Sequence, residues 1–123
     1  MSDPHTIISA DDLLAAPDCE EKWLPVPELG PGKAVKIKGM SKLAADQCRA
    51  RATVDGETKQ ELMEREWFMV GLIEPALTPA QYEAMKQKSA GLFYGILNGI
   101  LVESGMAPEV AKLARKAFLP GSG

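Results

Sequence analysis

Apolar and polar positions follow two different periods along this chain, and the change of period separates two kinds of element. Within residues 33 to 39, Val35 and Ile37 alternate with Lys36 and Lys38, a period-two pattern typical of a strand with one buried face. From Ser41 onward the apolar residues recur at helical spacing. The pattern predicts a mostly α-helical α+β fold, in which a short N-terminal helix and one β-hairpin pack on a bundle of about four to five helices.

The predicted hairpin spans residues 21 to 39. Its first strand covers residues 21 to 29 and contains Pro25 and Pro27. Because residues two apart point their backbone groups to the same side, both missing N–H donors fall on one side, which predicts an edge strand. The sequence Leu-Gly-Pro-Gly supplies the turn to the second strand. A two-stranded ribbon is marginal alone, so we expect its apolar face to pack on helices; that face comprises Leu24, Val26, Val35 and Ile37.

Helix start and stop signals divide the rest of the chain. Ser9 followed by acidic residues predicts a short helix that ends at Pro17. Ser41 predicts a helix to about residue 52, and the break at residues 53 to 56 precedes a helix from about 58 to 73.

Three further helices are expected after the Thr78-Pro79 start signal. The first covers residues 79 to 87, and the second begins after Ser89 and ends at Gly105 in a left-handed cap. The last covers residues 108 to 118, and its polar side carries Lys112, Arg115 and Lys116.

Two apolar surfaces in this helical part have no obvious polar face. Residues 67 to 73 are nearly all apolar, which fits a buried helix end, the reading we favour, or one that meets a partner. A glycine every fourth residue lets another backbone approach closely, within the molecule or in a self-association seam. The candidate client or self-association contacts are Trp67, Phe68, Leu72, Leu92, Phe93, Ile96, Leu97, Leu101, Gly91, Gly95 and Gly99.

Length and composition indicate one globular domain. The 123 residues, 46% hydrophobic and 25% charged, are enough to bury a core without a metal or disulfide. We expect a flexible N-terminus over residues 1 to 8, a domain over residues 9 to 119 with its helical part from about 41, and a flexible tail over residues 120 to 123. Cys19 and Cys48 belong to no C-x-x-C pair, so we expect reduced thiols. The sequence shows neither a signal-peptide pattern nor a membrane-length apolar run, which favours a cytoplasmic protein.

The net charge of −3 conceals two opposite blocks. Residues 1 to 30 hold seven acidic residues and one basic residue, whereas residues 31 to 52 hold six basic residues and one acidic residue. The simpler interpretation is pairing between adjacent strands of one molecule, and the alternative is head-to-tail association between copies. Nucleic-acid binding is not expected from an acidic chain with few aromatic residues and no recognised motif.

Catalytic chemistry finds little support in the residue pattern. The single histidine, His5, lies in the predicted flexible N-terminus, and no phosphate-binding glycine loop is present. The acid pairs, such as Glu61 with Glu64, fall on expected polar faces, where solvated carboxylates are usual. We therefore expect no catalytic residue, cofactor, metal or small-molecule substrate, although two carboxylates leave a hydrolase formally open.

The order of these elements resembles the tail assembly chaperones of long-tailed bacteriophages. The resemblance covers about residues 10 to 106 and is carried by "EKWLPVPELG", "KAVKIKGMS", "WFMVGLIEPALTPAQYEAM" and "AGLFYGILNGILVESGM". The shared features are a proline-bearing strand that ends in Gly, a basic second strand, a Val…Glu-Pro-x-Leu-Thr joint at residues 70 to 78, and a closing helix that ends in Ser-Gly. The Asp-Gly turn often found just before the joint lies further upstream here, at residues 55 and 56.

The resemblance implies a non-enzymatic chaperone that binds the long helical tape measure protein, keeps it soluble and helps to recruit tail tube subunits. Such a protein acts in the host cytoplasm, is not retained in the mature virion, forms homo-oligomers and is often accompanied by a form extended through a programmed frameshift. The alternative is a structural virion protein of the head-tail or tail-tip region, or a cytoplasmic helical adaptor domain.

Overall fold

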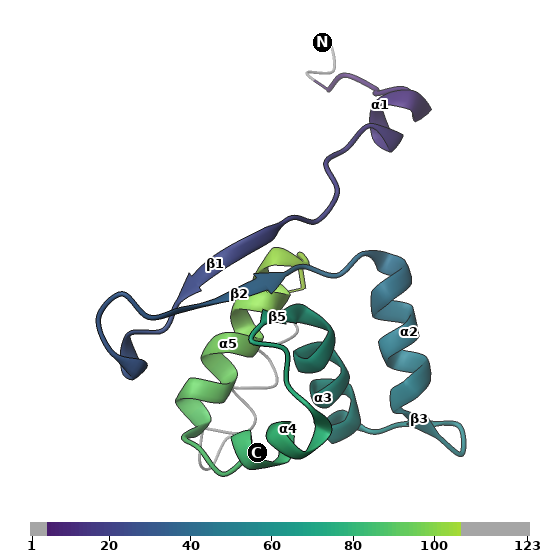
Figure 1. Cartoon of the computed structure of the whole chain (residues 1–123). Coiled ribbons are helices and arrows are strands. Elements are labelled where there is room, and N and C mark those ends of the chain that lie inside the picture. The colour runs from purple at the N-terminus through teal and green to yellow at the C-terminus, as the bar shows by residue number, and fades with distance from the viewer. Residues whose placement is uncertain (1–4, 107–123) are drawn as a thin grey trace, which may run out of the picture.

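The computed structural model describes residues 5–106. They form a helical body with a small sheet on one side and an N-terminal arm, residues 5 to 20, that leads away from the body (Figure 1). The fold is α+β and mostly helical, as predicted. The helices are α1 (Ala10–Leu14), α2 (Lys42–Ala52), α3 (Gln60–Gly71), α4 (Pro79–Met85) and α5 (Ala90–Glu103), with a 3₁₀ turn, η1, at Pro27–Leu29. The strands are β1 (Glu21–Pro25), β2 (Ala34–Lys38), β3 (Thr53–Val54), β4 (Glu57–Thr58) and β5 (Leu72–Glu74).

The predicted hairpin is confirmed, but its first strand is shorter than expected. β1 and β2 pair antiparallel with Leu24 opposite Val35, and β1 is an edge of the sheet, whose order is β1-β2-β5. The Val26 N–H still donates to the Lys33 carbonyl at 2.9 Å. Pro27 then begins η1, since its fixed φ suits a helical turn and it has no N–H to pair. The strand predicted over residues 21 to 29 is therefore wrong beyond Pro25.

The third strand of this sheet, β5, was not predicted from the sequence. The helix expected to reach residue 73 ends at Gly71, and Leu72–Glu74 pairs antiparallel with β2, with Leu72 opposite Ile37. An extended segment here gives β2 a second hydrogen-bonded neighbour and places Leu72 in the core. This gain depends on β2, which lies far away in the sequence, so the helical pattern of residues 67 to 73 does not reveal it.

The predicted break after α2 is a tight hairpin. Asp55 and Gly56 both have positive φ, 53° and 78°, as the two central residues of a type I′ turn require. The flanking β3 and β4 pair antiparallel, and the Thr53 and Thr58 hydroxyl oxygens lie 2.9 Å apart. The local Asp-Gly signal thus specifies a hairpin between α2 and α3.

The predicted helix boundaries agree with the structure wherever a local cap sets them. The Ser41, Thr78 and Ser89 hydroxyls each accept a hydrogen bond from a first-turn N–H of the following helix. α5 ends as expected with Gly105 at φ 74°, and the Met106 N–H donates to the Leu101 carbonyl at 2.7 Å, the pattern of a Schellman cap. The helix expected over residues 108 to 118 lies outside the described residues.

An aromatic cluster joins α3, α4 and α5 at the centre of the body. The rings of Phe68 and Phe93 stack with centroids 4.8 Å apart, and Tyr82 meets both edge-on. The hairpin packs on α5 at Gly99, where a Cβ would lie 2.8 Å from the Leu24 side chain. The predicted packing of the hairpin face on a helix is therefore confirmed.

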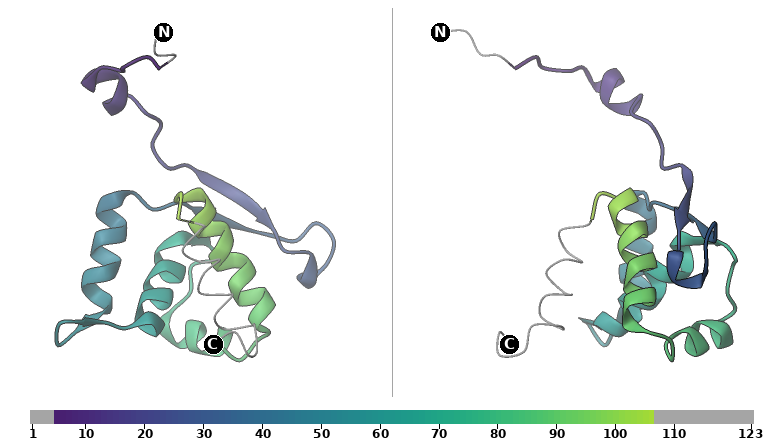
Figure 2. Two further views of the ribbon diagram at one scale, coloured as in Figure 1. Left: turned by 180° about the vertical axis from the view of Figure 1, so that it is seen from behind. Right: turned by 90° about the vertical axis from the view of Figure 1, so that its left-hand side faces the viewer.

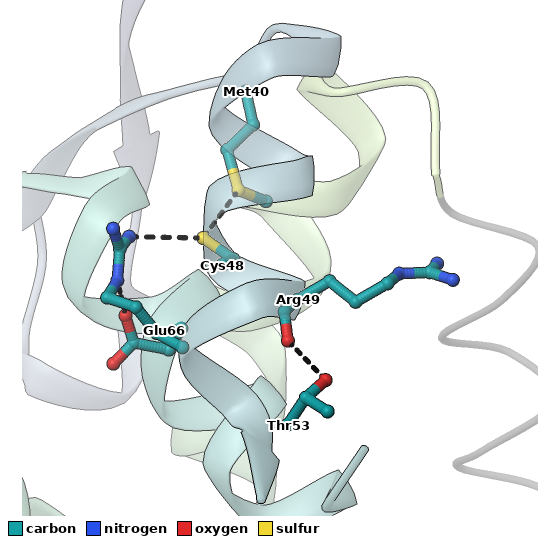
Figure 3. A network of polar contacts seen from close by, with 6 residues as sticks. Met40, Cys48, Arg49, Thr53 and Glu66 are labelled. Carbon is teal, nitrogen blue, oxygen red and sulfur yellow. Dashed lines mark hydrogen bonds and ion pairs between the residues drawn. The ribbon is translucent and has the colours of Figure 1, made fainter. Parts of the chain in front are cut away.

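An ion pair joins α2 to α3, and sulfur contacts lie within α2 and between α2 and the residue Met40 before it (Figure 3). Cys48 is fully buried, with its Sγ 3.8 Å from the Met40 Sδ and 3.8 Å from the Arg51 Nη2. Arg51 pairs with Glu66 of α3. Burial raises the pKa of the Cys48 thiol, so this cysteine serves packing. Cys19 and Cys48 are both free thiols.

Among residues 5–106, no helix combines the length and apolar character needed to cross a bilayer.

Candidate interaction site

The candidate contact residues chosen from the sequence form mostly the interior of the body. Seven of the eleven are buried, namely Trp67, Phe68, Leu72, Phe93, Ile96, Leu97 and Leu101. Leu92 and Gly99 are half-buried, whereas Gly91 and Gly95 are exposed and have open space beside them. The structure thus corrects the idea that this face is a free surface: the apolar residues of α3 and α5 face each other. Burial of the α3 end, the interpretation we favoured, is confirmed for Trp67 and Phe68.

The arm carries the most exposed apolar side chains of the described chain. Leu13 and Leu14 of α1 are 64% and 84% exposed, and Ile7 and Ile8 just before them are exposed as well. No residue of α1 is buried, and the three views in Figures 1 and 2 place α1 apart from the body. The short helix predicted after Ser9 is confirmed, but it does not pack on the domain as we expected.

α1 is well capped although it is isolated. The Ser9 hydroxyl accepts the Asp12 N–H, and the Asp12 carboxylate accepts the Ser9 N–H, both at 3.1 Å. A capping box of this kind fixes where a helix starts. A helix of five residues nevertheless falls far short of the roughly 12 to 15 residues that an isolated helix needs in water. The arm therefore has the features of a segment that gains its stability from a surface outside it.

A second exposed apolar side chain, that of Trp23, lies on the outer face of the sheet. Trp23 is 61% exposed, and the Lys36 Nζ lies 4.9 Å from the centroid of its ring. Glu21 and Glu74 flank the same lysine at 3.8 and 3.9 Å. Sequence reasoning counted Trp23 only as bulk in the strand. Its parity could have revealed the exposure, because Leu24 faces the core and its neighbour must face away.

A cavity of about 330 Å³ lies on another side of the body, between α3, α4 and α5, and Glu64 is among its lining residues. Burial raises the pKa of Glu64, and the Tyr94 hydroxyl donates to its carboxylate oxygens at 3.3 and 3.5 Å. Glu64 is thus not the solvated carboxylate that the sequence suggested. The lining residues are Glu61, Glu64, Tyr82, Lys86, Lys88, Ala90, Phe93 and Tyr94.

Two further charged residues of this cavity, Lys86 and Glu61, are paired with each other. The Lys86 Nζ lies 2.6 Å from Glu61 and 3.4 Å from Glu83, and burial raises the pKa of Tyr82 to about 12. The cavity is thus lined by one partly buried acid, Glu64, by aromatic walls and by two lysines, Lys86 and Lys88. Its lining residues include no serine, cysteine or histidine, and no cluster of three metal-ligating side chains occurs within residues 5–106.

The raised pKa of Glu64 makes a prediction about stability and pH. Because the folded state holds this proton more tightly than the unfolded chain, whose glutamate pKa is near 4.5, stability falls as the pH rises through the folded pKa. Gln stays neutral and keeps the acceptor for Tyr94, so we expect Glu64→Gln to be more stable than the wild type at pH 7 and nearly equal to it at about pH 4. Urea unfolding at several pH values measures this difference.

Glu28→Gln is the matched control, because Glu28 is an exposed carboxylate that forms no ion pair with residues 5–106. We expect it to leave the pH dependence of stability as it is in the wild type. A Glu64→Gln variant less stable than the wild type at pH 7 would contradict the assignment, since it would mean that the fold favours the carboxylate.

Within residues 5–106, the acidic and basic blocks of the sequence meet at a single ion pair. Glu21 of β1 lies 3.8 Å from Lys36 of β2, whereas Lys22 pairs with Glu103 at 3.0 Å. Within the described residues, no ion pair joins the acidic side chains of the arm to the basic block. Cross-strand pairing thus accounts for a small part of the charge pattern.

Comparison with known protein families, curated proteins and solved structures finds no match for the chain. The motifs behind the resemblance have structural roles within the fold. The Ser104 hydroxyl accepts the Met40 N–H at 2.7 Å and donates to the Ile100 carbonyl, so the Ser-Gly end of α5 holds the end of β2. The joint at residues 70 to 78 contains β5 and the Thr78 cap.

Proposed function

We propose that the chain is a non-enzymatic tail assembly chaperone of a long-tailed bacteriophage or prophage. It binds the helical tape measure protein in the host cytoplasm, keeps it soluble and helps to recruit tail tube subunits, and it leaves before the virion is complete. It works as a homo-oligomer, and a frameshift-extended form of the chain accompanies it. The motif order given above supplies the resemblance, and the exposed outer face of the sheet supplies the physical support.

Trp23 is the single observation that best supports a binding role. A tryptophan that is 61% exposed leaves a large apolar ring in water, and tryptophan is among the residues that dominate binding energy at protein interfaces. The Lys36 ammonium stacked on the ring and the flanking carboxylates give it a polar rim. A rimmed aromatic residue suits the apolar stripe of an amphipathic helix.

One such contact per copy is weak, but a long client can bind many copies at once. Copies aligned along a tape measure helix each add a small contact, and the effective concentration of neighbouring copies raises the overall affinity. Release during tail assembly then requires only that each weak contact be exchanged in turn. The proposal thus expects modest affinity from one copy and strong retention of the client by many.

The DNA that follows the reading frame tests the proposal first. We expect a slippery site near its 3′ end, an overlapping frame that extends the chain, and then a very long frame rich in predicted helix. Unrelated metabolic genes at that place would contradict the proposal.

Co-expression with the product of that long frame tests the role directly. We expect the chain to increase the soluble fraction of this product and to co-purify with it, and Trp23→Ala to weaken the interaction by about tenfold or more. Leu43→Ala is the matched control, since Leu43 is an exposed apolar residue on α2. Equal binding by both variants would remove Trp23 from the contact, and the chain's presence in purified particles would favour the structural virion protein instead.

A further inference from the structure

An apolar groove of about 500 Å³ opens at the base of the arm. Met40 and Ala44, at the start of α2, form one side, and Val70 and Ile73, at the end of α3 and in β5, form the other. Val70 is 37% exposed even though its neighbours Phe68 and Gly71 are buried. The fold thus leaves Ala44, Val70 and Ile73 partly uncovered in this groove, whereas Met40 is buried at its base.

The edge of this groove is basic, and the arm is acidic. Lys38 lines the groove and forms no ion pair with residues 5–106. Lys42 follows in the first turn of α2, where its side chain is 87% exposed and pairs with Asp46 of the same helix at 2.7 Å. The groove lining also contains one acid, Asp18. Residues 5 to 20 contain four acidic residues and neither lysine nor arginine, and two of the four, Asp11 and Asp12, lie in α1. The arm therefore matches the groove in two independent respects, with exposed leucines for its apolar walls and carboxylates for its basic edge.

The groove of the same copy is poorly placed to receive α1. Asp18 and Cys19 already line one end of it, and from there the chain runs outward to α1 in all three views (Figures 1 and 2). To enter this groove, α1 would have to turn back across the two residues that occupy its end. A second copy needs no such reversal, because its groove can approach α1 from outside.

We propose that residues 7 to 14 of the arm of one copy bind in the groove of a second copy. Leu13 and Leu14 then lie against Val70 and Ile73, and the carboxylates of α1 lie near Lys38 and Lys42. The contact is heterologous, because each copy donates an arm on one side and accepts one on the other. Such a contact repeats from copy to copy, so it forms closed rings or open chains. The contact requires no client, and it deepens the proposed function by naming the surfaces through which the copies associate.

Two variants of the full chain separate the two halves of the contact. Leu13→Ser combined with Leu14→Ser disables the arm, and Val70→Asp disables the groove by placing a charge in it. Neither change should prevent folding, since no residue of α1 is buried and Val70 is partly exposed, and circular dichroism verifies this. Leu43→Ser is the matched control, because it removes an exposed leucine that does not line the groove.

Light scattering after size exclusion, without any client, gives the mass of each sample. We expect the wild type and Leu43→Ser to exceed the 13.2 kDa of one copy, and each disabled variant to elute as a single copy with self-association at least about tenfold weaker. An equal mixture of the two disabled variants should form a dimer that grows no further, because one working arm and one working groove remain. Added salt should weaken the wild-type assembly, since screening acts on the exposed charges.

Two outcomes would overturn the proposal. A wild type that remains a single copy at about 100 μM, a concentration that supports even weak contacts, means that the arm docks on its own chain or on another protein. Assembly of the arm variant at wild-type strength means that copies associate through another surface. Both results are obtained without the tape measure product. A single-copy wild type would also remove the homo-oligomer from the proposed function, whereas client binding has its own tests.

Discussion

Gly39→Ala is expected to lower the free energy of unfolding by about 3 kcal/mol, because the new methyl group has no space. A Cβ at residue 39 would lie 2.4 Å from the Glu103 carbonyl oxygen and 2.6 Å from its carbonyl carbon. Both are backbone atoms of the last turn of α5, so they cannot rotate away as a side chain can. Relief of the clash would separate β2 from α5 and stretch the hydrogen bond between the Met40 N–H and the Ser104 hydroxyl. Urea unfolding of the variant and the wild type measures the loss.

Gly95→Ala is the matched control for this prediction. Gly95 lies within α5, and a Cβ there would meet nothing within 4 Å. Alanine favours the helix over glycine by roughly 0.5 to 1 kcal/mol, so we expect this variant to be more stable than the wild type. If both variants were destabilised equally, the close approach of Gly39 to α5 would not be the cause.

Phe68→Ala is expected to cost about 3 to 5 kcal/mol, the range for deleting a buried aromatic ring. Phe68 is fully buried, and its ring stacks on Phe93 at 4.8 Å and meets Tyr82 at 5.6 Å. Its loss leaves a cavity where α3, α4 and α5 meet, and neighbouring rings cannot fill it without leaving their own contacts. Thermal and urea unfolding together measure the effect, which could leave little folded protein at 37 °C.

Trp23→Ala serves as the control for the loss of an aromatic ring. Because Trp23 is exposed on the outer face of the sheet, we expect its removal to change stability by less than about 0.5 kcal/mol. The same variant is expected to weaken client binding. A stability loss comparable to that of Phe68→Ala would show that Trp23 contributes to the fold, and the binding experiment would then lose its meaning.

The two apolar stripes that the sequence offered as candidate contact surfaces are largely buried against each other in the structure. Residues 67 to 73 and the apolar residues of α5 form two similar stripes in the sequence, and nothing local says whether a stripe meets another part of the chain or a partner. In the structure they meet each other around Phe68 and Phe93. The exposed candidates are instead Trp23 and the leucines of α1. Strand parity could have identified Trp23, but no local pattern distinguishes the leucines of α1 from core residues.

The sequence by itself determined those features whose cause lies within a few residues. The hydroxyls of Ser41, Thr78 and Ser89 begin helices, and Gly105 ends one, because each partner is at most four residues away. Alternation and a turn likewise determined the β1–β2 hairpin. The tertiary structure alone decided that residues 72 to 74 form a strand, that Glu64 is partly buried and that α1 stands clear of the body. These three depend on segments distant in the chain, whose contacts outweigh local preference because they bury apolar surface or complete hydrogen bonds.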